Sequence, residues 1–239
     1  MSNLYTLFRN PNVLNIFSDA SLRARGQETD ICYGAVVVCG DEIIDSDYRI
    51  NSSKTSNYGE AQGVLLALGF AIKYKDRYPV INIFSDSQIT IFNIRDRYMN
   101  WKFHNDNYYN KSTGIVQNQS IFVEMMRIIC ENDLKVNFFH MKGHVEQRKF
   151  DDVKKAADVF ASSNRISGNK VDYGFIRYIS NYNTIVDITS RSILARTDIV
   201  VNRFYSPFTF VPTNDLLKEY KNRKLKEIGV NEKRNGKQE

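Results

Sequence analysis

The chain has 239 residues, 42% of them hydrophobic, and a net charge of +6, so it can bury a sizeable core as one or two globular domains. The modest basic excess permits a polyanionic partner, but it is equally common as ordinary surface charge. The three cysteines have no C-x-x-C spacing, which argues against a disulfide scaffold or a structural zinc site. The N-terminus has no apolar core of signal-peptide length and no apolar run is long enough to span a bilayer, so we expect a cytoplasmic protein without a membrane partner.

The first two thirds of the chain alternates strand and helix patterns. Short apolar runs bounded by turn residues predict strands, and apolar residues at helical spacing predict helices. In chain order we predict strands at 13–17, 32–38 and 42–50, a helix at 58–74, a strand at 80–84, helices at 87–99 and 120–131, a strand at 135–141 and a helix at 152–163. This order predicts an α/β fold with a five-stranded mixed sheet flanked by helices.

The composition changes after residue 167. Between 171 and 212 Asn, Tyr, Ser and Thr become frequent and the helical period is lost, whereas 215–228 fits a charged helix. We therefore predict a first domain at 12–167, followed at 168–239 by a C-terminal extension of unknown fold with a basic tail.

Four acidic residues stand out by their positions in the predicted elements. Asp19 and Asp86 each follow a buried strand, Glu60 lies in the first turn of the first long helix, and Asp158 lies between small and apolar residues of the last helix. A strand-end Asp usually caps a turn, and a first-turn Glu usually complements the helix dipole. Asp158 needs another reason, because burying an unpaired carboxylate is unfavourable.

A convergence of all four carboxylates would have a specific chemistry. The four groups would raise one another's pKa unless a cation neutralised them. Hard oxygen ligands without histidine or cysteine select Mg²⁺ or Mn²⁺ over zinc. Two such ions about 4 Å apart hold the attacking water and the leaving oxygen of an in-line phosphoryl displacement. The set therefore favours metal-dependent phosphoryl transfer.

Five short segments resemble, in order, the motifs of the type 1 ribonuclease H family: Phe17–Ser21, Thr55–Ala61, Phe84–Gln88, Lys142–His144 and Ala157–Ala161. Each segment alone is weak evidence, but all five occur in the family's order and on the expected kind of element. The resemblance implies a ribonuclease H-like fold that hydrolyses the RNA strand of RNA–DNA hybrids endonucleolytically. It also implies two Mg²⁺ or Mn²⁺ ions and products with 5′-phosphate and 3′-hydroxyl ends.

The resemblance implies roles for individual residues as well. The metal ligands and catalytic acids would be Asp19, Glu60, Asp86 and Asp158. Asp19 would bridge both ions, and His144 would assist proton transfer or product release. The last acid is open in the sequence, since Asp151 and Asp152 also follow His144. We prefer Asp158 for its apolar helical setting.

Substrate contacts follow from the same resemblance. Thr55, Asn57 and Gln88 match polar positions that touch the minor groove, where they would read the 2′-hydroxyls of RNA. Trp101 resembles the family's aromatic substrate contact. Because the segment around Trp101 mixes acidic and basic residues, we expect the basic tail to add phosphate contacts and its removal from residue 215 to leave the fold intact. The tail residues are Lys218, Lys221, Arg223, Lys224, Lys226, Lys233, Arg234 and Lys237.

Two alternative functions remain. One is a nuclease or resolvase of the same fold that cuts DNA, which the matches at Asn57 and Gln88 and the Lys-Gly-His segment disfavour. The other is a catalytically inactive nucleic-acid-binding domain. Retention of every acid disfavours it, because a binding domain gains nothing from negative charge that faces phosphates.

Overall fold

The computed structural model describes residues 3–25, 28–53, 55–196 and 211–235. They form two compact units, which we call unit 1 and unit 2. Unit 1 comprises the described residues of Met1–Phe92 and Lys135–Ser206, and unit 2 those of Asn93–Leu134 and Pro207–Glu239. Within the described ranges, no helix combines the length and the apolar composition that crossing a bilayer requires.

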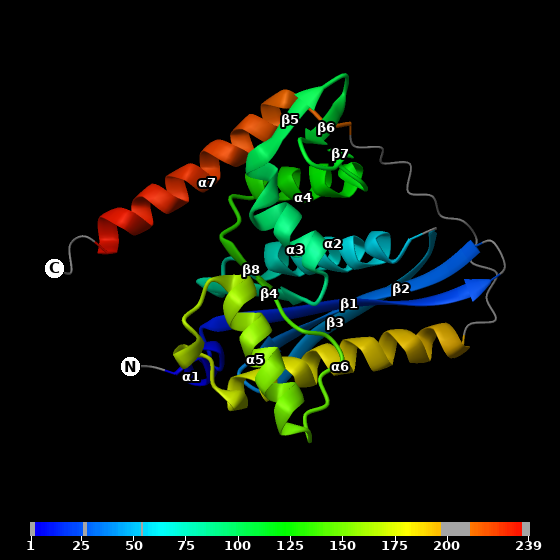
Figure 1. Ribbon diagram of the computed structural model, residues 1–239, viewed down its shortest axis with the longest axis vertical. Helices are drawn as coiled ribbons and strands as arrows, with labels where there is room; N and C mark the ends of the chain where they lie inside the picture. The colour runs from blue at the N-terminus through cyan, green and yellow to red at the C-terminus, as the bar shows by residue number, and fades with distance from the viewer. Residues whose placement is uncertain (1–2, 26–27, 54, 197–210, 236–239) are drawn as a thin grey trace. The chain divides into compact units, whose positions relative to one another are not determined.

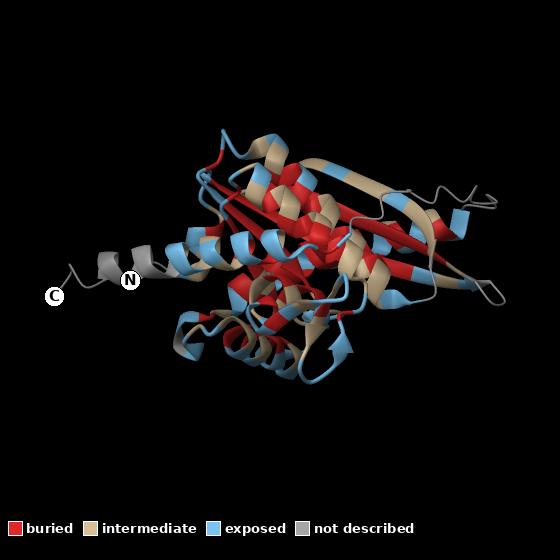
Figure 2. Cartoon of the chain, turned by 90° about the horizontal axis from the view of Figure 1, so that it is seen from above, coloured by how far each residue is buried: buried red, intermediate tan, exposed pale blue. Residues whose placement is uncertain are grey.

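Unit 1 is built on a five-stranded mixed sheet in the order β3-β2-β1-β4-β8 (Figure 1). The strands are β1 (Val13–Arg25), β2 (Glu28–Cys39), β3 (Glu42–Ser53), β4 (Val80–Ser85) and β8 (Val136–His140). The first three strands pair antiparallel, and β4 and β8 add in parallel on the other side of β1. Buried residues run through β1, β2, β4 and β8 (Figure 2), whereas the described residues of the edge strand β3 are exposed or half-buried. The predicted mixed sheet is confirmed.

Helices cover both faces of this sheet, with α2 and α6 on opposite sides (Figure 1). The helices of unit 1 are α1 (Leu4–Phe8), α2 (Ser56–Tyr74), α5 (Phe150–Asn164), the 3-10 turn η2 (Gly168–Lys170) and α6 (Tyr173–Arg196), together with the start of α3 (Gln88–Arg95). Successive β1 side chains alternate between the faces. Phe17 stacks on Phe84 and on Tyr182 of α6, at ring distances of 4.9 and 5.3 Å. Ala20 packs with Ile31 on the α2 side.

Two glycines let α2 approach β1 closely. A side chain at Gly59 would overlap Ile31, and a Cβ at Gly63 would lie 3.4 Å from the main-chain oxygen of Asp19. The helix begins at Ser56, two residues earlier than predicted, so Glu60 lies just past the first turn. This close packing brings Glu60 beside the strand that carries Asp19.

The helix α6 is the main departure from the sequence-based expectation. We expected no helical period between 171 and 212, but α6 is a 24-residue helix that packs along β1 and β2. Two tyrosines in its first half hydrogen-bond to the turn between β2 and β3. The Tyr178 hydroxyl donates to the Gly40 oxygen and the Tyr182 hydroxyl donates to the Asp41 oxygen, each at 2.7 Å. The expectation was wrong because the buried face of α6 also carries polar residues, which hide the apolar period.

Unit 2 combines two segments that are distant in the sequence. Its elements are the 3-10 helix η1 (Arg97–Asn100), β5 (Trp101–His104), β6 (Asn107–Asn110), β7 (Gly114–Ile115), α4 (Gln119–Glu131) and α7 (Asn214–Asn235). The three strands form a small antiparallel sheet, which we did not predict. Leu217 and Tyr220 of α7 are buried in this unit, and the Tyr220 hydroxyl donates to the Ile94 oxygen at 2.9 Å. The boundary expected at residue 167 therefore does not separate the units.

The structure also corrects the expected role of the basic tail. Lys221 donates to the Trp101 oxygen at 2.6 Å, and Arg223 pairs with Asp133 at 2.7 Å. These cations hold α7 to the rest of unit 2. Removing the chain from residue 215 would take the buried Tyr220 out of the core of unit 2, so we now expect this truncation to destabilise unit 2. Lys237 lies outside the described residues.

Candidate metal centre and active site

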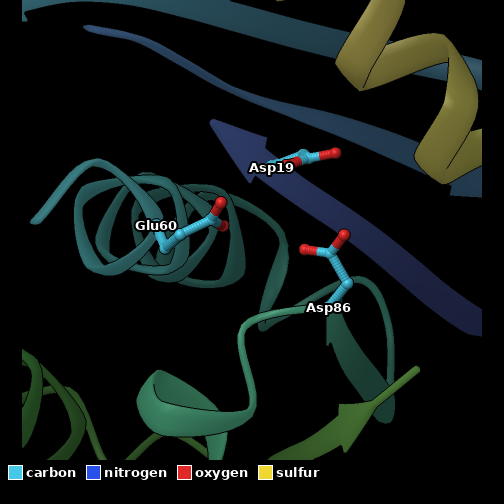
Figure 3. A group of neighbouring side chains, drawn as sticks. All are labelled: Asp19, Glu60 and Asp86. Carbon is cyan, nitrogen blue, oxygen red and sulfur yellow. The ribbon is translucent and has the colours of Figure 1, made fainter. Parts of the chain in front are cut away.

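Three of the four predicted acids come together in unit 1. Asp19 lies on β1, Glu60 on α2, and Asp86 directly follows β4. Each offers a carboxylate oxygen, and these oxygens all lie within 4.8 Å of one another. Figure 3 shows the three side chains pointing toward one another from a strand, a helix and a strand end. We call these residues the acidic cluster.

The electrostatics of the acidic cluster are unfavourable without a cation. Burial, followed by the charge of Asp86, raises the pKa of Asp19 to about 8. Burial and the neighbouring carboxylates also raise the pKa of Glu60, and burial raises the pKa of Asp86. Closely spaced acids that exclude water resist ionisation together. Metal-free protein therefore holds protons in this cluster at pH values where free carboxylates are ionised.

The residues of the acidic cluster fit a hard divalent cation. All three supply oxygen, the donor that Mg²⁺ and Mn²⁺ prefer. The Glu60 Oε2 atom is buried and accepts no hydrogen bond from any described group. An orphaned buried carboxylate oxygen is expensive, and a cation would satisfy it. The cluster can hold a metal ion on both grounds.

Asp158, the expected fourth acid, does not join the cluster. It is exposed on α5, and it lines a separate pocket of about 290 Å³ with Lys154 and Tyr173. The buried face of α5 carries Ala157 and Phe160. Successive helical residues differ by about 100° in direction, so the residue between two buried neighbours can point to solvent. The structure therefore removes the reason for preferring Asp158.

Asp187 on α6 takes the place beside the cluster, and the sequence analysis missed it. Its Oδ1 accepts a hydrogen bond from Ser21 Oγ at 3.2 Å, and its Oδ2 lies 3.6 Å from His144 Nδ1. Alongside burial, the charge of Asp187 helps raise the pKa of all three clustered acids. The sequence signal for it was the spacing of four residues between Asn183 and Asp187, which places both side chains on one face of a helix.

That asparagine, Asn183, links α6 directly to the cluster. It is buried, and its Nδ2 donates to Asp19 Oδ2 at 3.2 Å. A hydrogen bond from its side chain also opposes the raised pKa of Asp86. The neutral amide of Asn183 thus hydrogen-bonds to Asp19 and Asp86, two carboxylates that repel each other.

The loop that carries His144 is held against the cluster. Lys142 pairs with Asp152 at 3.1 Å, and Asp152 also accepts the Glu146 main-chain N–H at 2.6 Å. Asp152, one of the alternative acids for the metal site, therefore holds the loop. A side chain at Gly143 would overlap the Asp86 carboxylate.

His144 itself is exposed, with a φ of +49° in the left-handed region that few residues other than glycine adopt. Its side chain is 69% exposed, so the ring is accessible at the edge of the cluster. Asp151, the other alternative acid, is exposed and lines a pocket of about 640 Å³ with His144. The charge of His144 opposes the raised pKa of Asp86, which places the two groups in electrostatic contact.

The predicted substrate contacts divide into two groups. Thr55 directly precedes α2, Asn57 lies in its first turn, and Gln88 begins α3. Thr55 and Gln88 are exposed and Asn57 is half-buried, so all three remain accessible. Trp101 is different: it is buried in unit 2, with its ring 5.8 Å from that of Tyr108. Packing already covers the Trp101 ring, so the structure offers no support for the expected substrate contact.

Together, the sheet topology and the acidic cluster define an α/β fold that carries an oxygen-only candidate metal site. The family model described as RNase H matches residues 11–165, which is more than half of the chain. The chain therefore belongs to the RNase H family, and the suspected family and fold are confirmed. The match ends before α6 begins, so it does not include Asp187.

Solved structures that are similar to part of the chain include several ribonucleases H. LC11-RNase H1, isolated from compost by a metagenomic approach, is 16% identical with a TM-score of 0.42, covering 64% of this chain and 96% of that one. RNase H1 from Halobacterium salinarum NRC-1 is 17% identical with a TM-score of 0.40, covering 62% and 93%. The PFV RNase H domain is 13% identical with a TM-score of 0.47, covering 64% and 94%. No curated protein shows significant similarity to the chain.

Proposed function

We propose that this protein is a divalent-metal-dependent endonuclease that hydrolyses the RNA strand of RNA–DNA hybrids. One observation carries the proposal: in a chain of the RNase H family, three carboxylates from β1, α2 and the end of β4 converge within 4.8 Å. A cluster of this kind binds phosphate poorly without cations, so its retention favours catalysis over passive binding.

The proposed metal ligands are the acidic cluster and Asp187, with Mg²⁺ or Mn²⁺ as the ions. Two bound ions would supply positive charge to the attacking and leaving oxygens of an in-line phosphoryl transfer. Asp187 replaces Asp158 in this assignment. Its support is the hydrogen bond that Asn183 of the same helix donates to Asp19, and its own separation of 3.6 Å from His144.

His144 is proposed to move protons or to release product. Its Nδ1 faces Asp187 Oδ2, which leaves Nε2 as the nitrogen that exchanges a proton. A histidine that is oriented by a carboxylate and open to solvent suits either task. The Lys142–Asp152 ion pair holds the loop whose Gly143 lies against Asp86.

The proposed preference for RNA rests on the three accessible polar residues beside the cluster. Thr55, Asn57 and Gln88 present hydroxyl and amide groups that can hydrogen-bond to 2′-hydroxyls, which DNA lacks. The separations along the chain are short: Asn57 is three residues from Glu60, and Gln88 is two residues from Asp86.

Cleavage of end-labelled duplexes tests the proposal. RNA–DNA, RNA–RNA and DNA–DNA duplexes of one sequence are incubated with Mg²⁺, Mn²⁺ or EDTA, and Asp19→Asn serves as the inactive control. The proposal predicts internal cuts in the RNA strand of the hybrid, with metal only, and none by Asp19→Asn. Cutting of DNA–DNA alone would assign the chain to the DNA-cleaving alternative, and binding without cutting would assign it to the inactive one.

A further inference from the structure

The two carboxylate oxygens of Asp187 have different partners. Oδ1 accepts hydrogen bonds from Ser21 Oγ at 3.2 Å and from Arg191 Nε at 2.7 Å. Oδ2 lies 3.6 Å from His144 Nδ1. Two donors on one oxygen fix the rotation of a carboxylate, because both contacts are lost when it turns.

The two donors come from different elements. Arg191 lies one helical turn after Asp187 on α6, so this contact is an i,i+4 pair on one helix face. Ser21 lies on β1 two residues after Asp19, and its side chain therefore points to the same face of the sheet. The three residues tie the α6 acid to the strand that carries Asp19.

We propose that Ser21 and Arg191 are positioning residues that fix the rotation of Asp187 through Oδ1 and so leave Oδ2 available to the proposed metal ion. This inference rests on the proposed function, and it adds two residues to the site. Arg191 is 59% exposed, and exposed ion pairs contribute little to folding stability. The main effect of the Arg191–Asp187 contact is therefore to orient Asp187. Groups that hydrogen-bond to metal ligands set the geometry of the site and its affinity for the ion.

The positioning role and simple electrostatics predict opposite effects of Arg191→Ala on metal affinity. Removing a positive charge beside four carboxylates makes the site more negative, which by itself tightens the binding of a dication. Removing the Nε donor frees Asp187 to rotate, which weakens that binding. Ser21→Ala removes the other donor without any change of charge, so a weakening there reflects orientation alone.

The test measures Mn²⁺ affinity in the full-length protein without substrate, by electron paramagnetic resonance titration. The variants are Arg191→Ala, Arg191→Lys, Ser21→Ala and Asp187→Asn. Arg196→Ala is the matched control, because Arg196 is an exposed arginine farther along α6. Circular dichroism melts verify that each variant is folded.

We expect Arg191→Ala and Ser21→Ala to weaken Mn²⁺ binding by about 10-fold, the lower end of the usual effect for such partners. Arg191→Lys should recover part of the affinity, Arg196→Ala should not weaken it, and Arg191→Ala should add nothing to Asp187→Asn. Unchanged or tighter binding in Arg191→Ala overturns the positioning role while leaving the proposed function intact. Wild-type affinity in Asp187→Asn would instead refute the proposed ligand set.

Discussion

The repulsion within the acidic cluster predicts how Asp19→Asn changes the stability of metal-free protein. Replacing this buried acid by a neutral isostere removes one of the three clustered ionisable groups and keeps the shape of the side chain. Cleavage should be lost, but the free energy of unfolding in EDTA should rise at neutral pH. If the substitution abolishes activity and stabilises the fold, then the clustered carboxylates that serve the site also destabilise the metal-free protein.

The magnitude follows from the pKa of Asp19, which burial and Asp86 raise from 3.8 to about 8. Because the folded pKa lies above the unfolded value, the folded state binds the extra proton between these limits. The contribution of Asp19 to stability is therefore most favourable below about pH 4 and is lost as the pH rises toward 8. One pKa unit is worth about 1.4 kcal/mol, so the penalty at pH 7 reaches about 4 kcal/mol. Asp19→Asn should recover part of it, since an amide is also desolvated.

The assay is urea denaturation of wild type and Asp19→Asn in EDTA at pH 5, 6, 7 and 8. The stability difference between the two proteins should grow with pH, because only the wild type carries the raised pKa of Asp19. Asp158→Asn is the control, as Asp158 is exposed, and its difference should stay flat. Mg²⁺ should stabilise the wild type more than Asp19→Asn. A pH-independent difference would refute the argument that proton uptake by the cluster limits stability.

Three further predictions concern the loop and unit 2. His144→Ala should slow cleavage by about 10²–10⁴-fold without eliminating it; single-turnover and steady-state rates separate proton transfer from product release, and unchanged rates in both would remove His144 from the mechanism. Gly143→Ala should displace Asp86 and weaken Mn²⁺ binding, whereas Gly168→Ala, where an added Cβ meets nothing within 4 Å, should not; equal affinities would contradict the close packing. Tyr220→Ala should lower the stability of unit 2 by about 3–5 kcal/mol, as other buried aromatic truncations do. Hydrogen exchange in α4 reports it, and unchanged protection would mean that α7 does not complete that core.

Apolar pattern alone predicted the centre of the fold. The strands β1, β4 and β8 each contain a short, mostly apolar run that is interrupted by one asparagine, and α2 carries apolar residues at helical spacing. The predicted first strand stopped at Phe17, although β1 runs to Arg25, because its second half carries Asp19, Ser21 and Arg23. A strand that enters a polar site loses the hydropathy signal at the point where the site begins.

The same effect explains why α6 was missed and why Asp158 was preferred over Asp187 as the fourth acid. The buried face of α6 includes Asn183, Asp187 and Ser190, so its period is visible only if buried polar residues are counted with apolar ones. Asp158 was preferred for its apolar neighbours, but these neighbours fill the core while Asp158 points to solvent. Sequence proximity on a helix does not specify direction, and the packing of α6 on β1 is a long-range contact that no local pattern contains.

Cleavage of an RNA–DNA hybrid by Asp187→Asn and Asp158→Asn, side by side under saturating Mg²⁺, tests the central claim most directly. Both substitutions remove one carboxylate from a helix of unit 1, and they differ in whether that carboxylate lies beside the acidic cluster. The account predicts that Asp187→Asn loses nearly all activity and that Asp158→Asn retains the wild-type rate. The reverse pattern, with Asp158 essential and Asp187 dispensable, would contradict the assignment of the fourth carboxylate to α6.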